Sequence, residues 1–146
     1  LYAYAGEQYK TAKLVQQINT TLYTDKKDGI CGNEDCGQMS AWYIFSSLGF
    51  YPVNSANGMY VFGSPLHDEA TINLPEKKTF TVKANGVSDS NIYIQSVTLN
   101  GQPYTKSYIT HSDILKGGEL VFEMSATPNL EFGKKPENRP RSIKYD

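Results

Sequence analysis

Apolar residues near the start of the chain recur at helical spacing. Within residues 7–24 they fall every three or four positions, which is the pattern of one apolar stripe on an amphipathic helix. The stripe consists of Tyr9, Ala12, Val15, Ile18 and Leu22. Residues 38–48 are apolar nearly all round and are followed by Gly49, a residue that commonly ends helices. We therefore expect two helices, the second of them buried on several sides.

After Pro52 the apolar pattern changes to a period of two. Short β-branched and aromatic runs alternate there with Gly, Pro, Asn and Asp, which is typical of strands separated by turns. The runs cover residues 60–62, 70–74, 79–84, 92–99, 104–109 and 120–124. Asn100-Gly101 predicts a hairpin turn of type I′, because that turn needs a positive φ at both positions. The pattern indicates a small antiparallel β-sandwich or half-barrel.

Composition and charge exclude some classes of partner for this chain of 146 residues. Lys and Arg total 14 against 15 Asp and Glu, so the formal net charge of -1 favours neither nucleic acid nor an anionic membrane surface. No apolar stretch approaches the ~20 residues of a membrane span. The chain starts at Leu1 without Met or a secretory leader. We interpret it as a fragment, so the missing leader says nothing about export.

The two cysteines, Cys31 and Cys36, are five residues apart. In an exported protein such a pair can close a loop disulfide, and otherwise we expect two free, largely buried thiols. The sequence leaves these two alternatives open. A zinc site is disfavoured because the histidines, His67 and His111, lie far along the chain. A Cys/His nucleophile pair is also disfavoured, because it would need a cysteine beside His67 or His111 and the sequence does not show that proximity.

The strongest candidate for a functional site lies between the two predicted helices. Residues 28–43 read DGICGNEDCGQMSAWY and combine carboxylates and an amide with three glycines. Glycines let the backbone approach a ligand, carboxylates act as bases or hold a hard cation, and an amide offers a neutral oxygen or a hydrogen bond to a sugar. The polar candidates are Asp28, Asn33, Glu34 and Asp35.

A purely structural interpretation of the same residues stays open. Asp35 is followed three positions later by Gln38, just before an apolar helix, which is the pattern of a capping box. Glu34 would then be a solvated charge, favoured by the positive start of the helix. An EF-hand is excluded because lysines and cysteines stand where calcium ligands would be needed.

A specific resemblance is carried by residues 31–53, CGNEDCGQMSAWYIFSSLGFYPV. This run resembles a signature of glycoside hydrolase family 92, the calcium-dependent exo-acting α-mannosidases. The opening LYAYAGEQYKTAKLVQQI is similar to the helix that precedes the signature, and MYVFGSPLHDEATINL and NIYIQSVTLNG are similar to the family's C-terminal β segment. A run of this length is far more specific than a short motif.

The resemblance implies an α+β fold. Residues 1–50 would be the closing helices of an (α/α)₆ barrel with its active-site loop, and residues 51–126 a small antiparallel β-sandwich-like region. Independently of the resemblance, the three prolines and the charged residues of segment 127–146 predict an irregular, loosely ordered C-terminal tail. Barrel helices missing from this chain would then cover the apolar segment 38–48.

The resemblance also implies a chemistry for the full-length protein. It would hydrolyse terminal, commonly α-1,2-linked mannose of glycans with inversion, using two carboxyl groups. Asp35 occupies the position of the base that activates water. Asn33 stands where some relatives carry a second Asp and would at most position that water. Calcium in the family contacts sugar hydroxyls, and Asn33 and Glu34 are placed only in its vicinity.

The general acid of the family is a Glu from an upstream motif that this chain does not match. We therefore expect the chain alone to be inactive and to need the missing N-terminal part of the same enzyme as its partner. The resemblance implies an exported protein, periplasmic or extracellular. Two other classes stay open: a carbohydrate-binding β module, favoured by aromatic residues in the predicted strands, and a structural β module that contacts no sugar.

Overall fold

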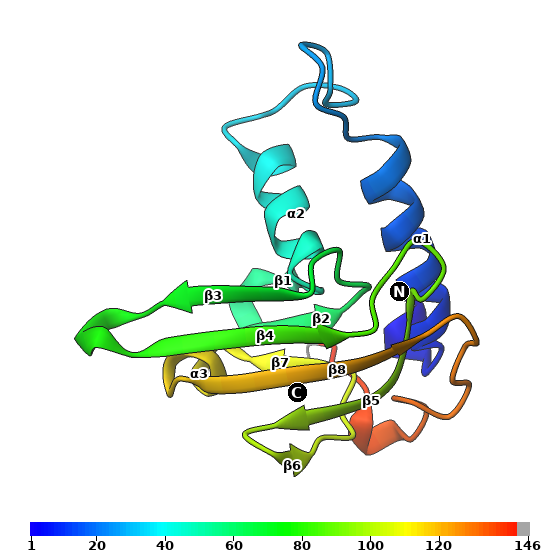
Figure 1. Ribbon diagram of the computed structural model, residues 1–146, viewed down its shortest axis with the longest axis vertical. Coiled ribbons are helices and arrows are strands. Elements are labelled where there is room, and N and C mark those ends of the chain that lie inside the picture. Colours follow the sequence, from blue (N-terminus) through cyan, green and yellow to red (C-terminus); the bar gives the residue numbers. More distant parts are fainter. Residues whose placement is uncertain (143–146) are drawn as a thin grey trace.

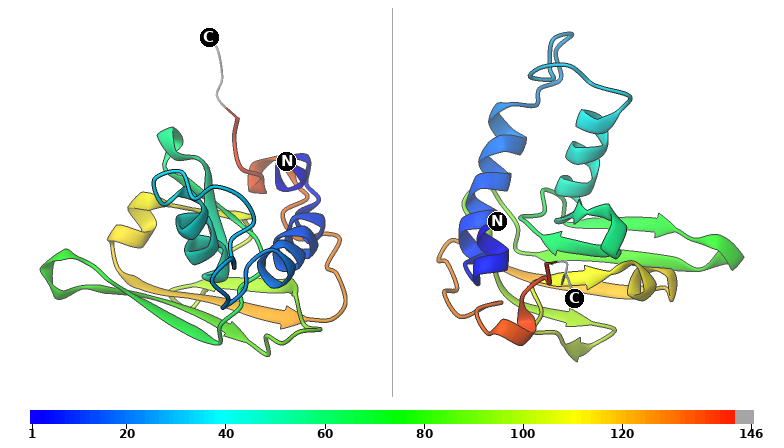
Figure 2. Two further views of the ribbon diagram at one scale, coloured as in Figure 1. Left: turned by 90° about the horizontal axis from the view of Figure 1, so that it is seen from above. Right: turned by 180° about the vertical axis from the view of Figure 1, so that it is seen from behind.

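The computed structural model describes residues 1–142. Two helices, α1 and α2, rise side by side from a β region and are joined at their far end by a long loop (Figures 1 and 2). The helices are α1 (Gln8–Thr21), α2 (Gln38–Ser47) and α3 (His111–Leu115), with 3-10 turns η1 (Tyr2–Ala5), η2 (Ser55–Asn57), η3 (Pro75–Lys77) and η4 (Pro136–Asn138). Both predicted helices are confirmed. None of the helices in the described part of the chain has the length and apolar character to cross a membrane.

The apolar helix α2 is only partly covered. Its buried residues are Ser46 and Ser47, at the end that meets the β region, whereas Ile44 is 58% exposed. Residues 1–142 therefore do not supply all the neighbours that a helix of this composition requires. The expectation of burial on several sides is not met within residues 1–142, although α1, β1 and the aromatic rings of Tyr23 and Tyr60 pack against this helix.

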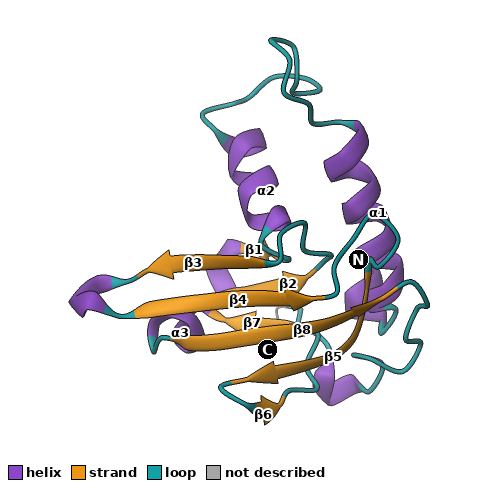
Figure 3. Cartoon of the chain, in the orientation of Figure 1, coloured by secondary structure: helices purple, strands orange, loops and turns teal. Residues whose placement is uncertain are grey.

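The β region consists of two sheets (Figure 3). A three-stranded sheet has the order β1-β2-β7, and a five-stranded sheet has the order β3-β4-β8-β5-β6. The strands of the first sheet are β1 (Phe50–Asn54), β2 (Met59–Phe62) and β7 (Tyr108–Thr110). Those of the second are β3 (Glu69–Asn73), β4 (Thr79–Asn85), β5 (Tyr93–Leu99), β6 (Gln102–Pro103) and β8 (Gly118–Ser125). Together with the helices, this arrangement confirms the α+β class.

The core lies between the two sheets. Strand β4 alternates as predicted, with Phe80, Val82 and Ala84 buried and the residues between them more exposed. The rings of Phe62 in β2 and Phe122 in β8 meet edge to face, with centroids 5.1 Å apart, and so join one sheet to the other. Such aromatic pairs add to the stabilisation that burial of their area already gives.

Three details of the strand prediction differ from the structure. Strand β4 pairs with β8 in parallel, with Phe80 opposite Gly118, and not antiparallel like the other pairs. This is because the chain crosses over through β5, β6, β7 and α3 before it returns. The run 104–109 is not one strand, since the chain leaves the five-stranded sheet after β6 and joins the other sheet at β7. Strand β1 was not predicted because it contains Pro52, which is tolerated at the sheet edge where β1 lies.

The hairpin turn between β5 and β6 is confirmed. Asn100 and Gly101 have φ values of 52° and 75°, as a type I′ turn requires. Leu99 pairs with Gln102 across it. Asn100 also accepts the N–H of Glu119 with its side-chain oxygen, at 2.8 Å, so the turn is tied to β8.

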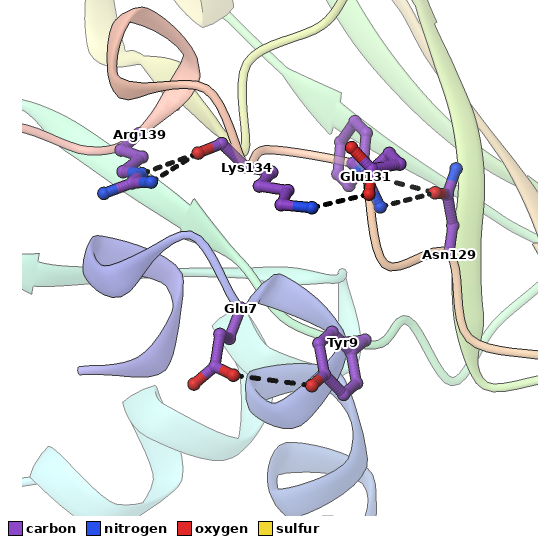
Figure 4. A network of polar contacts seen from close by, with 7 residues as sticks. Glu7, Tyr9, Asn129, Glu131, Lys134 and Arg139 are labelled. Atoms are coloured by element: carbon purple, nitrogen blue, oxygen red, sulfur yellow. Dashed lines mark hydrogen bonds and ion pairs between the residues drawn. The ribbon is translucent and has the colours of Figure 1, made fainter.

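The C-terminal segment is packed, contrary to the loosely ordered tail that the prolines indicated. Phe132 is buried in the main core, and the carbonyl of Asn138 accepts the N–H of Ser107 at 2.8 Å. Figure 4 shows Arg139 turned to the carbonyl of Lys134, which it reaches with Nε at 2.9 Å. A Cβ on Gly6 would lie 2.7 Å from Arg139 Nε, so this segment covers the start of the chain. Residues 143–146 of the predicted tail lie outside the described residues.

Candidate functional site

The predicted site residues all lie in the loop that joins α1 to α2, at the end of both helices away from the sheets (Figures 1 and 3). The loop, residues 22–37, begins with a small hairpin. Tyr23 and Ile30 form an isolated antiparallel bridge, and Thr24 donates its N–H to the carbonyl of Gly29 at 2.9 Å. A Cβ on Gly29 would stand 2.1 Å from the carbonyl oxygen of Thr24. Glycine is therefore required at this position for the hairpin to close.

Tyr23 fastens the hairpin to α2. Its hydroxyl donates to the carbonyl of Met39 at 3.2 Å. Its ring stacks on Trp42 and Tyr43, with centroid distances of 5.6 and 4.9 Å. Burial, and then the neighbouring Cys31 and Glu34 groups, raise the pKa of this hydroxyl above its usual value, so it stays a hydrogen-bond donor. Sequence reasoning missed Tyr23 because its partners lie sixteen or more residues further along the chain.

Glu34, and not Asp35 as the capping-box pattern indicated, accepts the hydrogen bonds of the first amides of α2. The N-cap of α2 is Gly37, which has no side chain to bond with. Glu34 Oε1 instead accepts the N–H of Ser40 at 2.9 Å, and the carbonyl of Glu34 accepts the N–H of Gln38 at 3.0 Å. The capping box is wrong because the turn before the helix shifts the N-cap from Asp35 to Gly37. Glu34 is accordingly only partly exposed, and its Oε2 is buried without a partner among the described residues.

Asp35 sits on a bend of unfavourable backbone conformation. Asp35, Cys36 and Gly37 have φ values of 45°, 62° and 88° in succession. A left-handed residue with a Cβ costs about 1–2 kcal/mol, although Asp tolerates it better than most. Such conformations gather at functional sites, where the surrounding structure holds them. The Asp35 side chain is exposed and makes no hydrogen bond or ion pair with the rest of residues 1–142.

The remaining loop candidates are exposed as well. Asn33 and Asp28 both face solvent. Cys31 and Cys36 are free and exposed, so the expectation of largely buried thiols is wrong. The loop projects beyond both helices, and nothing in the described part of the chain covers the two thiols. His67 and His111 belong to other parts of the fold, and His111 Nδ1 lies 3.0 Å from the hydroxyl of Tyr60.

A cavity of about 550 Å³ opens beside this loop. It lies between the hairpin and the exposed side of α2. Its lining residues are Tyr23, Thr24, Asp25, Gly29, Ile30, Ser40, Tyr43 and Ile44. Asn33, Glu34 and Asp35 are not among them. The described residues thus present Asp35 on an open surface and do not enclose it.

Residues 1–142 do not by themselves fit a calcium site. Calcium takes six to eight oxygen ligands, and among residues 1–142 there is no group of three or more His, Cys, Asp or Glu side chains that could hold a metal. The unpartnered Glu34 Oε2 and the exposed amide of Asn33 would together supply two oxygens at most. The other ligands would have to come from outside the described residues.

Comparison with known proteins gives consistent matches. Residues 1–126 match the model of the glycosyl hydrolase family 92 catalytic domain. An uncharacterized secreted glycosidase of Arthroderma benhamiae is 36% identical over 124 residues, which cover 82% of this chain and 16% of that protein.

Solved structures agree with this match. That of a family GH92 inverting mannosidase from Bacteroides thetaiotaomicron is 42% identical, with a TM-score of 0.91 over 97% of this chain. That of a second family GH92 α-mannosidase from the same bacterium is 38% identical, with a TM-score of 0.92 over 99% of this chain. The chain spans only 19% and 20% of the length of these two structures.

Proposed function

Because this chain belongs to glycosyl hydrolase family 92, we propose that the full-length protein is an exo-acting, inverting α-mannosidase and that Asp35 is its general base. The observation that carries the assignment is the exposed Asp35 carboxylate, held on a left-handed bend inside the segment that matches the family's catalytic domain. The mannosidase activity in the names of two similar structures supports the reaction class.

In the proposed reaction, a water oxygen attacks the anomeric carbon while the bond to the leaving oxygen breaks. Asp35 accepts the proton that the water loses, and a second carboxyl group gives its proton to the leaving oxygen. The Asp35 side chain has no hydrogen-bond partner within residues 1–142, so its carboxylate oxygens are free to take this proton. Asn33, two residues earlier and also exposed, would position the water. The acid would come from a part of the longer protein outside this sequence.

The substrate and the location are part of the same proposal. We infer that the protein removes terminal α-1,2-linked mannose from glycans and is exported to the periplasm or the extracellular space. The relative named as a secreted glycosidase supports export. Calcium held by the assembled protein remains a prediction, and no step above depends on it.

The decisive experiment compares the full-length protein with its Asp35→Asn variant on α-1,2-mannobiose. The amide cannot take a proton, so kcat should fall by about 10²- to 10⁴-fold, with KM changed much less. Asp28→Asn removes another exposed carboxylate of the same loop and should keep kcat within about twofold. Proton NMR during turnover should show β-mannose as the first product, as inversion requires. An Asp35→Asn variant with wild-type kcat would overturn the assignment of the base.

The chain alone is the second arm of this experiment. We expect the 146-residue chain to release no mannose. Release of mannose would show that the second carboxyl group lies within the chain. Saturable binding of mannobiose to the chain without calcium would instead favour the carbohydrate-binding module.

A further inference from the structure

One residue satisfies the start of α2. The carbonyl of Glu34 accepts the N–H groups of Gln38 and Met39 at 3.0 and 3.4 Å. Its carboxylate oxygen Oε1 accepts the N–H of Ser40 at 2.9 Å. These are the first three amides of the helix, which have no partner within the helix itself. Glu34 therefore caps α2 in place of the N-cap residue Gly37, which has no side chain that could accept a hydrogen bond.

The hydrogen bonds of Glu34 close a ring around Asp35. The ring starts at Glu34, passes through the left-handed residues Asp35 and Cys36, and returns from Ser40 to the Glu34 carboxylate. A left-handed conformation of a residue with a Cβ persists only where its surroundings impose it. The hydrogen bonds of Glu34, which enclose Asp35, impose this conformation. They fix the backbone at Asp35 and with it the direction of the Cα–Cβ bond that carries the carboxylate.

We propose that Glu34 is a positioning residue, which sets the Asp35 carboxylate in place by capping α2. This inference rests on the proposed function of Asp35 as the base. The competing role for Glu34 is that of a calcium ligand, through the buried and unpartnered Oε2. The two roles need different properties of the side chain. Capping needs an acceptor oxygen at the reach of Glu, whereas calcium affinity depends on the number of negatively charged ligands and falls when this charge is lost.

Two conservative variants of the full-length protein separate the effect of the length of the Glu34 side chain from the effect of its charge. Glu34→Gln keeps an acceptor oxygen at the same distance and loses the charge. Glu34→Asp keeps the charge but is one methylene shorter, so it does not reach the Ser40 amide. For positioning, kcat should fall at least tenfold in Glu34→Asp and stay within about threefold in Glu34→Gln, with KM within about twofold in both, because small misplacements of a catalytic group act on kcat.

Hydrogen exchange at the Ser40 amide gives a readout independent of activity. Exchange should be at least tenfold faster in Glu34→Asp than in the wild type and unchanged in Glu34→Gln. Wild-type kcat in Glu34→Asp, or equal exchange in the two variants, would overturn the proposal. So would a Glu34→Gln protein that loses activity and recovers it only at raised calcium concentration.

The Asp35→Asn variant distinguishes failure of this inference from failure of the proposed function. If Asp35→Asn keeps wild-type kcat, the base is misassigned, while the exchange of the Ser40 amide still tests the cap. If Asp35→Asn is inactive and Glu34→Asp is not, only the positioning role of Glu34 is refuted.

Discussion

Single residues in the α1–α2 loop have tasks that differ from what their types suggest. The structural interpretation of the sequence predicts a solvated Glu34 and an Asp35 in a capping box, whereas Glu34 caps the amides of α2 and the Asp35 side chain stays exposed. The reason is geometric. Two successive left-handed residues displace the helix start, so that the carboxylate one position earlier is the one that meets the helix amides.

Substitutions of Tyr23 test how much its contacts with α2 stabilise the loop. Tyr23→Phe removes the hydroxyl that donates to the Met39 carbonyl and should lower the free energy of unfolding by about 0.5–1.5 kcal/mol. Tyr23→Leu also removes the stacking on Trp42 and Tyr43 and should lower it by roughly a further 0.5–1.5 kcal/mol for each ring pair. Urea denaturation of the three proteins gives these differences. Equal stability of the Phe and Leu variants would refute the contribution of stacking.

The exposed cysteines make a second prediction for single residues. Both thiols should react with an aromatic disulfide reagent in the native protein without prior reduction, because Cys31 and Cys36 are free and exposed. The absorbance of the released thiolate should correspond to two equivalents for each chain. Cys36→Ser should lower this value to one. No reaction before reduction would show instead that the two cysteines form the loop disulfide.

Among the larger segments, the C-terminal one differs most from its sequence-based prediction. Its sequence has the prolines and charges of a loose tail, yet Phe132 lies in the main core. The carbonyl of Asn138 also accepts the N–H of Ser107, the residue just before β7. The ion pair between Lys134 and Glu131 in Figure 4, with both side chains more than half exposed, contributes little by comparison.

A pair of substitutions measures the contribution of this segment. Phe132→Ala should lower the free energy of unfolding by about 3–5 kcal/mol, since it removes a large side chain that is only 8% exposed. Leu130→Ala, at a position 54% exposed in the same segment, should change it by less than ~0.5 kcal/mol. Chemical denaturation monitored by fluorescence gives both values. Similar small effects of the two substitutions would mean that the segment does not stabilise the fold.

The whole molecule has an uneven surface. The β region buries a continuous aromatic and aliphatic core, whereas the helices and their connecting loop leave large apolar side chains in solvent, among them Leu14, Leu22 and Ile44. An apolar surface of this kind, on a chain that spans about a fifth of the length of similar structures, suits contact with further protein.

At the scale of the molecule we therefore expect the 146-residue chain to self-associate. Size-exclusion chromatography should show oligomers, and Ile44→Lys should shift the elution toward the monomer because it places a charge on the exposed side of α2. Leu115→Lys, at a position 45% exposed on α3, is the control and should leave the elution unchanged. A wild-type chain that elutes as a single monomer peak would contradict this prediction.

Many structural features of this protein could be predicted from the sequence because they depend on residues that are close together along the chain. The two helices, most strands, the Asn100-Gly101 turn and the family resemblance of residues 31–53 follow from local spacing or from a continuous motif. The parallel pairing of β4 with β8, the buried Phe132, the Tyr23 anchor and the cap from Glu34 were decided only by the tertiary structure. Each of the first three joins residues far apart in sequence, and the cap depends on a strained bend that no residue pattern announces. For that reason the sequence located the Asp35 loop, and the fold determined how its residues divide their tasks.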